Sequence, residues 1–369
     1  MTRVVAVVGT RPEAIKMAPV VLRLREEPGF ETIVCATAQH RDLLDSALAL
    51  FGIRPDLDLD LMRPDQTPSS VAAGVLQAFD PILRDLAPDV VLVQGDTTTV
   101  MAAALACFHR RIAVGHVEAG LRTSNLRNPF PEEMNRRVTD LVADHHFAPT
   151  PRSAAALAAE GIDRGKIHVT GNTVVDALRW LAGRVASAEG GDRRDLVLVT
   201  SHRRESFGEP MRSAFRAIAR LARRFPETRF VFPVHPNPNV IEAARVFEGI
   251  ANVELHPPVD YARLVGWMRE CRLVLTDSGG IQEEAPTFGK PTLVLRETTE
   301  RPEGVEAGVA RLVGTDEEAI FREAEKLLTE PEAYAAMARA ANPYGDGRAA
   351  ERIVSILAGR RAEPFTPGA

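Results

Sequence analysis

The sequence has few cysteines, few aromatic residues and no long uninterrupted apolar segment. Three cysteines occur among 369 residues, far apart and without the CxxC spacing of zinc or redox sites. Cys35, Cys107 and Cys271 each lie in an apolar stretch, so we expect them to be reduced and buried. No apolar run approaches the roughly 18 residues of a membrane-spanning helix. These features argue against a membrane protein and a cysteine-based metal site.

The charge balance contains no excess of basic residues. The net charge is −5 and the isoelectric point is about 6.0. This balance argues against bulk electrostatic binding to nucleic acid or to an anionic membrane, although it permits a local basic pocket. The apolar run 3–8 is short and is followed at once by Gly9 and the charged Arg11. It indicates a buried first strand rather than a signal segment, and we expect a cytoplasmic protein.

Short runs rich in valine, isoleucine and leucine alternate with longer helical patterns along the chain. Continuous apolar strands between amphipathic helices predict an α/β fold of parallel sheets covered on both faces. The alternation runs twice, which predicts two Rossmann-like lobes with a cleft between them. The expected strands are 4–8, 32–36, 90–93, 113–117 and 146–148, then 196–200, 230–233, 253–255, 273–276 and 292–295. The expected helices include 12–25, 43–51, 69–86, 209–224 and 316–328.

The polar, glycine-containing stretch 186–194 has no apolar period and is expected to be a linker or surface loop between the halves. We assign residues 1–170 to an N-terminal lobe and 171–348 to a C-terminal, nucleotide-binding lobe. A last helix within 349–358 could pack back on the first lobe. Ligands of open parallel sheets bind beyond the carboxyl ends of the strands, so the loops that follow strands are the candidate sites.

Three strand-end loops of the first half carry acids. Asp96 follows one expected strand and Glu118 follows the next, while Glu132 and Glu133 open a helix after a Pro-Phe-Pro segment. Each has a structural explanation when taken alone: Asp96 suits a helix N-cap, and acids are stabilised in the first turn of a helix. Together they indicate proton transfer, because clustered carboxylates shift one another's pKa and can separate acid from base roles.

Cations and a glycine-rich loop follow the other strands. Gly9-Thr10-Arg11-Pro12-Glu13 lacks the GxGxxG pattern, but Arg11 and Lys16 could face an anion at a helix start, or could be surface cations. His202 stands beside two arginines, which favours an anion site. His235 lies in a proline-rich turn and fits a ligand contact or an ordinary loop residue equally well.

The segment 277–284 predicts a phosphate site in the second half. Ser278, Gly279 and Gly280 open a helix and would expose backbone N–H groups to a phosphate. Glu284 lies further along that helix, at the distance of a ribose, and Arg301 adds a cation from the next loop. No Walker A motif, GxSxG elbow or metal-ligand spacing occurs in the sequence, so we expect neither a metal nor a cofactor.

Eleven sequence blocks resemble the non-hydrolysing bacterial UDP-N-acetylglucosamine 2-epimerases. They span almost the whole chain in order: GTRPEAIKMAP (9–19), TAQHR (37–41), GDTTT (95–99), GHVEAGLRT (115–123), FPEEMNRR (130–137), TGNTVVDAL (170–178), SHRRESFG (201–208), PVHPNPNV (233–240), TDSGGIQEEAP (276–286), TTERPE (298–303) and NPYGDG (342–347). Any one block alone would be weak evidence, but the complete set is highly specific.

The resemblance implies a fold like the two-lobed GT-B glycosyltransferases, a homodimer, and interconversion of UDP-N-acetylglucosamine with UDP-N-acetylmannosamine for cell-surface polysaccharide synthesis. By position it implies that Asp96, Glu118 and Glu132 are the acid/base carboxylates and that His202 lies near the diphosphate. It also implies that the nucleotide-sugar site is lined by Arg11, Lys16, His235, Ser278, Gly279, Gly280, Glu284 and Arg301. Gln39, Arg204 and His235 are candidates for binding a second, activating substrate molecule.

Four other functions remain open at this point. A hydrolysing epimerase would share the elimination step and release N-acetylmannosamine and UDP. A related epimerase would act on a modified UDP-sugar. A GT-B glycosyltransferase would need an acceptor site and fewer carboxylates, and a binding module without activity would not need three strand-end acids.

Overall fold

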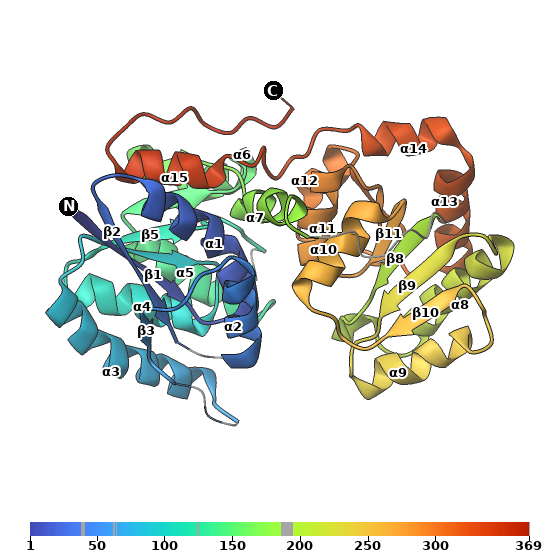
Figure 1. Ribbon diagram of the computed structural model, residues 1–369, viewed down its shortest axis with the longest axis horizontal. Coiled ribbons are helices and arrows are strands. Elements are labelled where there is room, and N and C mark those ends of the chain that lie inside the picture. The colour runs from blue at the N-terminus through green and yellow to red at the C-terminus, as the bar shows by residue number, and fades with distance from the viewer. Residues whose placement is uncertain (38–40, 62, 64, 124, 186–194, 369) are drawn as a thin grey trace. The chain divides into compact units, whose positions relative to one another are not determined.

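The structure is a computed structural model that describes residues 1–37, 41–61, 63, 65–123, 125–185 and 195–368 (Figure 1). The chain forms two compact units. Unit 1 comprises Met1–Ala177 and Gly345–Pro367, and unit 2 comprises Leu178–Tyr344. The stretch 186–194, predicted to separate the halves, lies outside the described residues. The two units divide within helix α7 (Thr173–Ala182), between Ala177 and Leu178.

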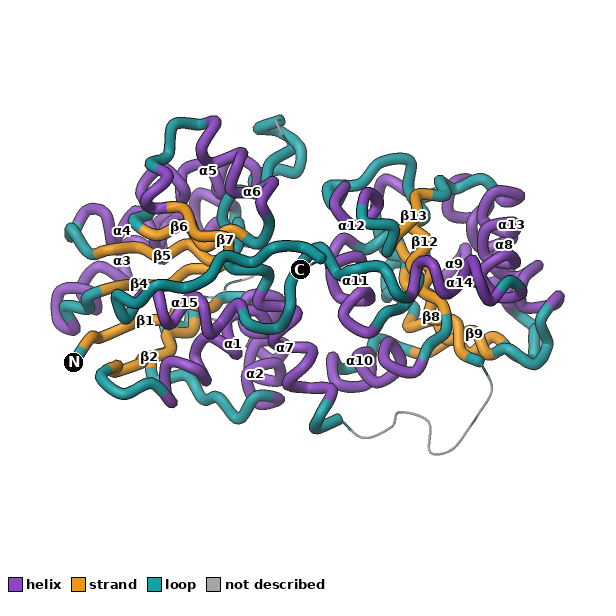
Figure 2. Tube along the Cα trace, turned by 90° about the horizontal axis from the view of Figure 1, so that it is seen from above, coloured by secondary structure: helices purple, strands orange, loops and turns teal. Residues whose placement is uncertain are grey.

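Unit 1 contains a seven-stranded sheet in the order β3-β2-β1-β4-β5-β6-β7, and every strand pair is parallel. Its helices lie on both faces of the sheet (Figure 2). The strands are β1 (Thr2–Val8), β2 (Phe30–Ala36), β3 (Leu57–Asp58), β4 (Val90–Gln94), β5 (Ala113–Val117), β6 (His145–Ala148) and β7 (Ile167–Val169). The helices are α1 (Arg11–Glu26), α2 (Arg41–Leu50), α3 (Pro68–Leu86), α4 (Thr98–His109), α5 (Glu132–Val142), α6 (Pro151–Ala159), the short η1 (Arg164–Lys166) and α15 (Ala349–Leu357).

Unit 2 repeats this architecture with six parallel strands in the order β10-β9-β8-β11-β12-β13. The strands are β8 (Leu196–Thr200), β9 (Arg229–Pro233), β10 (Val253–His256), β11 (Leu273–Thr276), β12 (Thr292–Val294) and β13 (Ala310–Leu312). The helices are α8 (Glu209–Arg224), α9 (Pro238–Ala244), α10 (Tyr261–Glu270), α11 (Gly279–Glu284), α12 (Pro302–Glu306), α13 (Glu317–Thr329) and α14 (Pro331–Ala338), with short η2 (Arg204–Ser206), η3 (Arg245–Phe247) and η4 (Ala285–Phe288). The two parallel-sheet units confirm the predicted α/β fold class.

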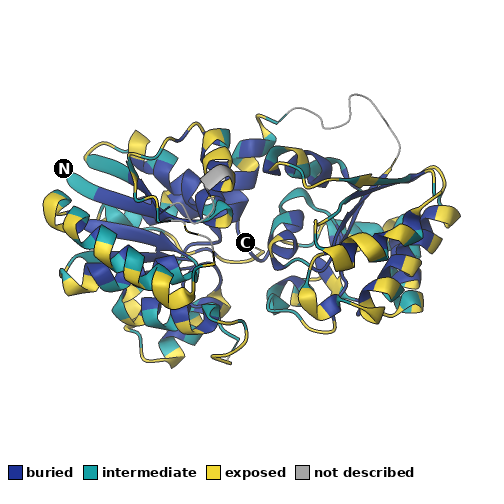
Figure 3. Cartoon of the chain, turned by 90° about the horizontal axis from the view of Figure 1, so that it is seen from below, coloured by how far each residue is buried: buried dark blue, intermediate teal, exposed yellow. Residues whose placement is uncertain are grey.

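The central strands are buried because helices cover both faces of each sheet (Figure 3). All five residues of β4 and all five of β8 are buried, which explains their continuous apolar sequences. The core of unit 2 contains three phenylalanine rings that contact one another in edge-to-face or tilted pairs: Phe215, Phe232 and Phe247. Cys35, Cys107 and Cys271 are free and buried, as predicted.

The C-terminal helix α15 packs against α1 of unit 1. The Asp176 carboxylate accepts hydrogen bonds from the first backbone N–H groups of α15, those of Ala349 (3.2 Å) and Ala350 (2.9 Å). Arg352 of the same helix donates to the Thr170 carbonyl. Together these contacts hold α15 beside the segment that leads into α7.

The order of each sheet reverses at one point, and this point determines where a ligand can bind. In unit 1 the chain runs outward from β1 in one direction and from β4 in the other. In unit 2 the same reversal lies between β8 and β11. At such a switch point the loops after neighbouring strands diverge and leave a crevice at the carboxyl edge of the sheet. The loops after these four strands are therefore the first places to look for a site.

Candidate functional site

A buried acid, Glu13, supports the loop after β1 through hydrogen bonds. Thr10 caps α1 and forms a capping box with Glu13. The Glu13 carboxylate also accepts a 2.6 Å hydrogen bond from the Gly9 N–H. Burial raises the pKa of Glu13 to about 7, although these hydrogen bonds act in the opposite direction. Gly9 has no room for a side chain, since an added Cβ would lie 2.5 Å from Oγ1 of Thr37.

Glu118 stands directly after β5 in a strained backbone conformation. Its φ of 67° is in the left-handed region that residues with side chains rarely adopt. The carboxylate is 6% exposed and accepts hydrogen bonds from Lys16 Nζ (2.5 Å), Asn172 Nδ2 (3.1 Å) and Gln94 Nε2. Such strain persists where the surroundings over-determine it, and it is concentrated at functional sites.

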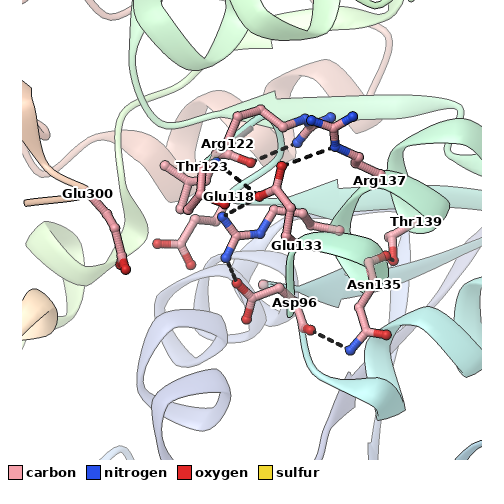
Figure 4. Close-up of polar contacts among 12 residues, drawn as sticks. Asp96, Glu118, Arg122, Thr123, Glu133, Asn135, Arg137, Thr139 and Glu300 are labelled. Atoms are coloured by element: carbon pink, nitrogen blue, oxygen red, sulfur yellow. Dashed lines mark hydrogen bonds and ion pairs between the residues drawn. The ribbon is translucent and has the colours of Figure 1, made fainter. Parts of the chain in front are cut away.

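Asp96 lies in the turn after β4, beside Glu118. Its carboxylate, 30% exposed, is paired with Arg136 of α5, and its backbone carbonyl accepts a 2.9 Å hydrogen bond from Asn135 Nδ2 (Figure 4). The two strand ends are adjacent, since Gln94 is in register with Val117. The structure thus brings together Asp96, Glu118 and Lys16 at the switch point of unit 1.

Glu132 and Glu133, of which only the family resemblance singled out Glu132, differ sharply in their surroundings. Glu133 is fully buried and satisfied: it accepts from Arg137 Nε (3.0 Å) and the Thr123 N–H (3.0 Å) and lies 3.5 Å from Arg136. Glu132 has a buried Oε2 without a hydrogen-bond partner among the described residues. Glu133 is therefore a structural residue. One carboxylate oxygen of Glu132 therefore accepts no hydrogen bond from the described part of the chain. A buried oxygen in this state costs free energy of folding unless a ligand donates to it.

In unit 2, Asp277 organises the loop after β8. This buried carboxylate accepts hydrogen bonds from Ser201 Oγ (2.8 Å) and from the N–H groups of His202 (3.0 Å) and Arg203 (3.0 Å). The His202 ring stacks on His235 at 5.9 Å between centroids. Desolvation lowers the pKa of His202, although the Asp277 charge acts to raise it. The ring is therefore favoured in its neutral form near pH 7.

The start of α11 lies against two guanidinium groups. A Cβ added to Gly279 would be 3.2 Å from Arg203 Nη2 and 3.8 Å from Arg301 Cζ. Arg301 is oriented by Glu283, at 2.7 Å from its Nε. At Gly280 an added Cβ would lie 3.6 Å from a Glu284 oxygen. Two of the predicted groupings are therefore present. Gly279 lies beside Arg301, and Gly280 lies beside Ser278 and Glu284. Backbone N–H groups and arginines in this arrangement suit a phosphate group.

Arg11 and Arg204 stand apart from these contacts, whereas His235 joins them by stacking on His202. Arg11 is the first residue of α1 and is partly exposed. Arg204 begins the short η2, and both Arg204 and His235 are exposed. Gln39 lies outside the described residues.

Several residues of the site were not predicted individually, although all but Gln94 lie within the motif blocks. They are Gln94, Arg136, Asn172, Arg203 and Asp277. A polar residue at the end of an apolar strand was the signal for two of them, Gln94 and Asp277.

The described ranges contain no group of three or more histidine, cysteine, aspartate or glutamate residues that could hold a metal ion. They also contain no helix long and apolar enough to cross a bilayer.

Comparisons with known proteins agree on one family. The sequence model of the family described as UDP-N-acetylglucosamine 2-epimerase matches residues 22–358. The curated UDP-N-acetylglucosamine 2-epimerase of Yersinia pestis is 50% identical over 368 residues, covering 96% of this chain and 98% of its own.

Solved structures give the same result. The crystal structure of UDP-GlcNAc 2-epimerase from Neisseria meningitidis bound to UDP-GlcNAc matches with a TM-score of 0.90 and 45% identity, over 97% of this chain and 100% of that one. The enzyme from Methanocaldococcus jannaschii in complex with UDP-GlcNAc and UDP matches with a TM-score of 0.78 and 32% identity, over 97% and 100% of the two chains. These matches confirm the GT-B-like fold class.

Proposed function

The chain belongs to the UDP-N-acetylglucosamine 2-epimerase family, and we propose that it reversibly converts UDP-N-acetylglucosamine to UDP-N-acetylmannosamine. The observation that carries this proposal is the group of strand-end carboxylates in unit 1, with Glu118 strained and held by Lys16, Gln94 and Asn172. Inversion of a carbon that bears hydrogen requires a proton to leave one face and return to the other. A site with more than one carboxylate meets that requirement.

The proposed mechanism is elimination and re-addition. C2 has no neighbouring carbonyl, so its proton is not acidic enough to be removed directly. The C1–O bond breaks and its electron pair leaves with UDP, while the electrons of the C2–H bond form the C1=C2 double bond of 2-acetamidoglucal. A proton then adds to the opposite face of C2, and a UDP oxygen adds to C1. Asp96, Glu118 and Glu132 transfer the protons, each step contributing roughly 10²–10⁴-fold.

Unit 2 is proposed to stabilise the departing diphosphate. The Ser278–Gly280 backbone, Arg301 and His202 would donate to its oxygens, and Glu284 would contact the ribose. His235 and, in unit 1, Arg11 and Lys16 are proposed as further substrate contacts. Water would be kept from the intermediate so that it is not lost. We expect no net hydrolysis, which distinguishes this proposal from the hydrolysing alternative, and the product would supply cell-surface polysaccharide synthesis.

A single experiment tests the reaction and its mechanism. The protein is incubated with UDP-N-acetylglucosamine in deuterium oxide, and the products are followed by proton NMR. We expect UDP-N-acetylmannosamine with deuterium at C2, and deuterium at C2 in recovered UDP-N-acetylglucosamine. Free N-acetylmannosamine released with UDP in equal amounts would support the hydrolysing alternative. An unchanged C2 proton signal would overturn the epimerase proposal.

A homodimer is also proposed, by likeness to the family. Phe108 of α4 and Leu141 of α5 are 58% and 76% exposed and line a surface cavity of about 710 Å³ in unit 1. Large exposed apolar side chains that adjoin one another are typical of protein interfaces. Light scattering should give the mass of two chains, and Leu141→Glu should reduce it to one. A monomeric wild-type protein would refute this part.

A further inference from the structure

A histidine with no assigned role is buried directly behind the proposed carboxylates. His116 lies in β5, two residues before Glu118, and its side chain is 0% exposed. It cannot touch a substrate. Its ring nitrogens instead contact two different elements, the turn after β4 and helix α5.

The contacts of the ring define its protonation. Nε2 lies 2.8 Å from the Gly95 carbonyl oxygen, and a carbonyl can only accept, so Nε2 carries a hydrogen. Nδ1 lies 2.6 Å from Oδ1 of Asp140, whose other oxygen accepts from Arg122 Nη2 at 2.8 Å. Burial acts to raise the pKa of Asp140, but His116 and Arg122 lower it. The ion pair with Arg122 holds this carboxyl as an acceptor. Both ring nitrogens of His116 therefore donate, and the ring is a cation.

The charged groups around this cation are Asp140, Arg122 and Glu160. Asp140 of α5 faces Nδ1, and Arg122 pairs with both Asp140 and Glu160. His146 of β6 contacts the backbone carbonyl of Asp140 at 2.8 Å through Nε2. Two carboxylates thus neutralise the His116 and Arg122 cations, as a buried ionic group requires.

The Gly95 carbonyl belongs to the turn that carries Asp96. Gly95 has a φ of 81° and donates its N–H to the Val117 carbonyl at 3.1 Å, while Asn135 binds the Asp96 carbonyl. A Cβ at Gly95 would lie 3.9 Å from Oε2 of Glu118. The peptide that His116 holds is therefore close to the Glu118 carboxylate and is bonded directly to Asp96.

We propose that His116 is a positioning residue: as an imidazolium anchored by Asp140, it donates to the Gly95 carbonyl and so fixes Asp96 relative to Glu118. A charge-assisted hydrogen bond is roughly twice as strong as a neutral one. Misplacement of a reacting group by about 1 Å can cost about 10²-fold in rate. The expected effect on turnover rests on the proposed epimerase function, whereas the hydrogen bonds of His116 are independent of it.

Two isosteric variants test the proposal. In His116→Gln the amide nitrogen can occupy the place of Nε2 and still donate to Gly95. In His116→Asn the amide occupies the place of Nδ1, and the Gly95 contact is lost. Both variants lose the charge beside Asp140, so a purely structural role would lower stability and kcat alike in both. We expect His116→Asn to lower kcat by roughly 10- to 100-fold with KM within about two-fold, and His116→Gln to retain most of kcat.

Equal kcat values in the two variants, with folding confirmed by urea denaturation, would overturn the proposal. Crystal structures of both variants provide a readout that does not depend on activity: the Gly95–Asp96 peptide should reorient in His116→Asn and stay in place in His116→Gln. An unmoved peptide in His116→Asn would refute the positioning role even in an active enzyme. Nitrogen-15 NMR of the wild-type imidazoles should show both His116 nitrogens protonated at pH 7, and a neutral ring would refute the cation. An inactive wild type with these structural results would refute the proposed function alone.

Discussion

The two units are built on the same plan but place opposite chemistry at their switch points. In unit 1 the side chains at the strand ends are carboxylates, Glu118 and Asp96, each held by a cation of unit 1. In unit 2 they are His202, Arg203 and the backbone at the start of α11, and the buried acid Asp277 serves to hold that loop. In the proposed function, the first set would exchange protons and the second would bind the diphosphate.

The difference lies in how a carboxylate is used. Asp277 is fully buried, and its hydrogen bonds go to the loop that it supports. Asp96 is partly exposed and Glu132 has an unsatisfied oxygen, so both retain capacity for a ligand. The identity of an acid therefore does not determine its role. Among Asp277, Asp96 and Glu132, exposure and unsatisfied oxygens separate the acids, and Glu118 is distinguished by its strained backbone.

Removing a proton-transfer group should give the largest effect. Asp96→Asn and Glu118→Gln keep the shape of each side chain but cannot accept a proton. We expect turnover to fall by roughly 10²–10⁴-fold, because a general acid/base step is lost. UDP affinity should survive, since the diphosphate is assigned to unit 2. Coupled assays measure turnover, and titration calorimetry measures UDP binding.

Glu26→Gln is the matched control for these variants, because that side chain in α1 is 72% exposed and lies at the far end of the helix. It should leave turnover unchanged. Near-normal turnover in either acid variant would remove that residue from the mechanism. Loss of UDP affinity in either would contradict the division between the units.

The second effect is on stability and comes from Glu13, a buried acid of unit 1. Burial raises the pKa of Glu13 from 4.5 to about 7, so the folded protein binds this proton more tightly than the unfolded chain does. The free energy of unfolding should therefore fall as the pH rises from about 4.5 to 7, by up to about 3 kcal/mol from this group. Glu13→Gln keeps an acceptor for the capping box and should remove this slope.

Urea unfolding of the wild type and Glu13→Gln at several pH values between 4.5 and 8 measures the difference. The variant should gain stability relative to the wild type with rising pH, and the gap should stop growing above about pH 7. Parallel curves would show that Glu13 is not buried in its protonated form. Glu26→Gln again serves as the exposed control.

The sequence predicted the interior strands of each sheet and the edge strand β10, but missed the other three edge strands. Strands such as β4 and β8 are buried on both faces, so their residues form a continuous apolar run. The edge strands β3, β7 and β13 have two or three residues each and were not predicted, because so short a strand has no pattern of its own. It is the register with a neighbouring strand that defines them.

The same distinction applies to the site. The strand-end rule places Asp96 and Glu118 correctly after β4 and β5, because it depends only on local sequence. Their partners are far away in the chain: Lys16 precedes Glu118 by 102 positions, and Asn172 follows it by 54. The choice between Glu132 and Glu133 also depended on folding, because Thr123 comes from a loop outside the helix. Pairing across such separations cannot be read from local patterns.

A smaller effect is expected from the acid of unit 2. Asp277→Asn replaces one accepting oxygen by a donor that would face the N–H groups of His202 and Arg203. We expect a loss of about 1–3 kcal/mol in the free energy of unfolding and weaker UDP binding, because the loop is no longer held. Urea denaturation and calorimetry measure the two effects. Unchanged UDP affinity in a destabilised but folded variant would show that this loop does not bind the diphosphate.

The smallest effect should come from Arg204, a proposed contact of a second, activating substrate molecule. Its side chain is exposed and has no ion pair or hydrogen bond among the described residues, so it is available to an anion. In the reverse reaction, added UDP-N-acetylglucosamine should activate the wild type, and Arg204→Ala should weaken that coupling by about 1 kcal/mol, a roughly five-fold change. Arg212→Ala, at an exposed position paired with Glu209, should have no such effect. A hyperbolic wild-type velocity curve unaffected by UDP-N-acetylglucosamine would remove the activating site, and with it the only regulatory role proposed for unit 2.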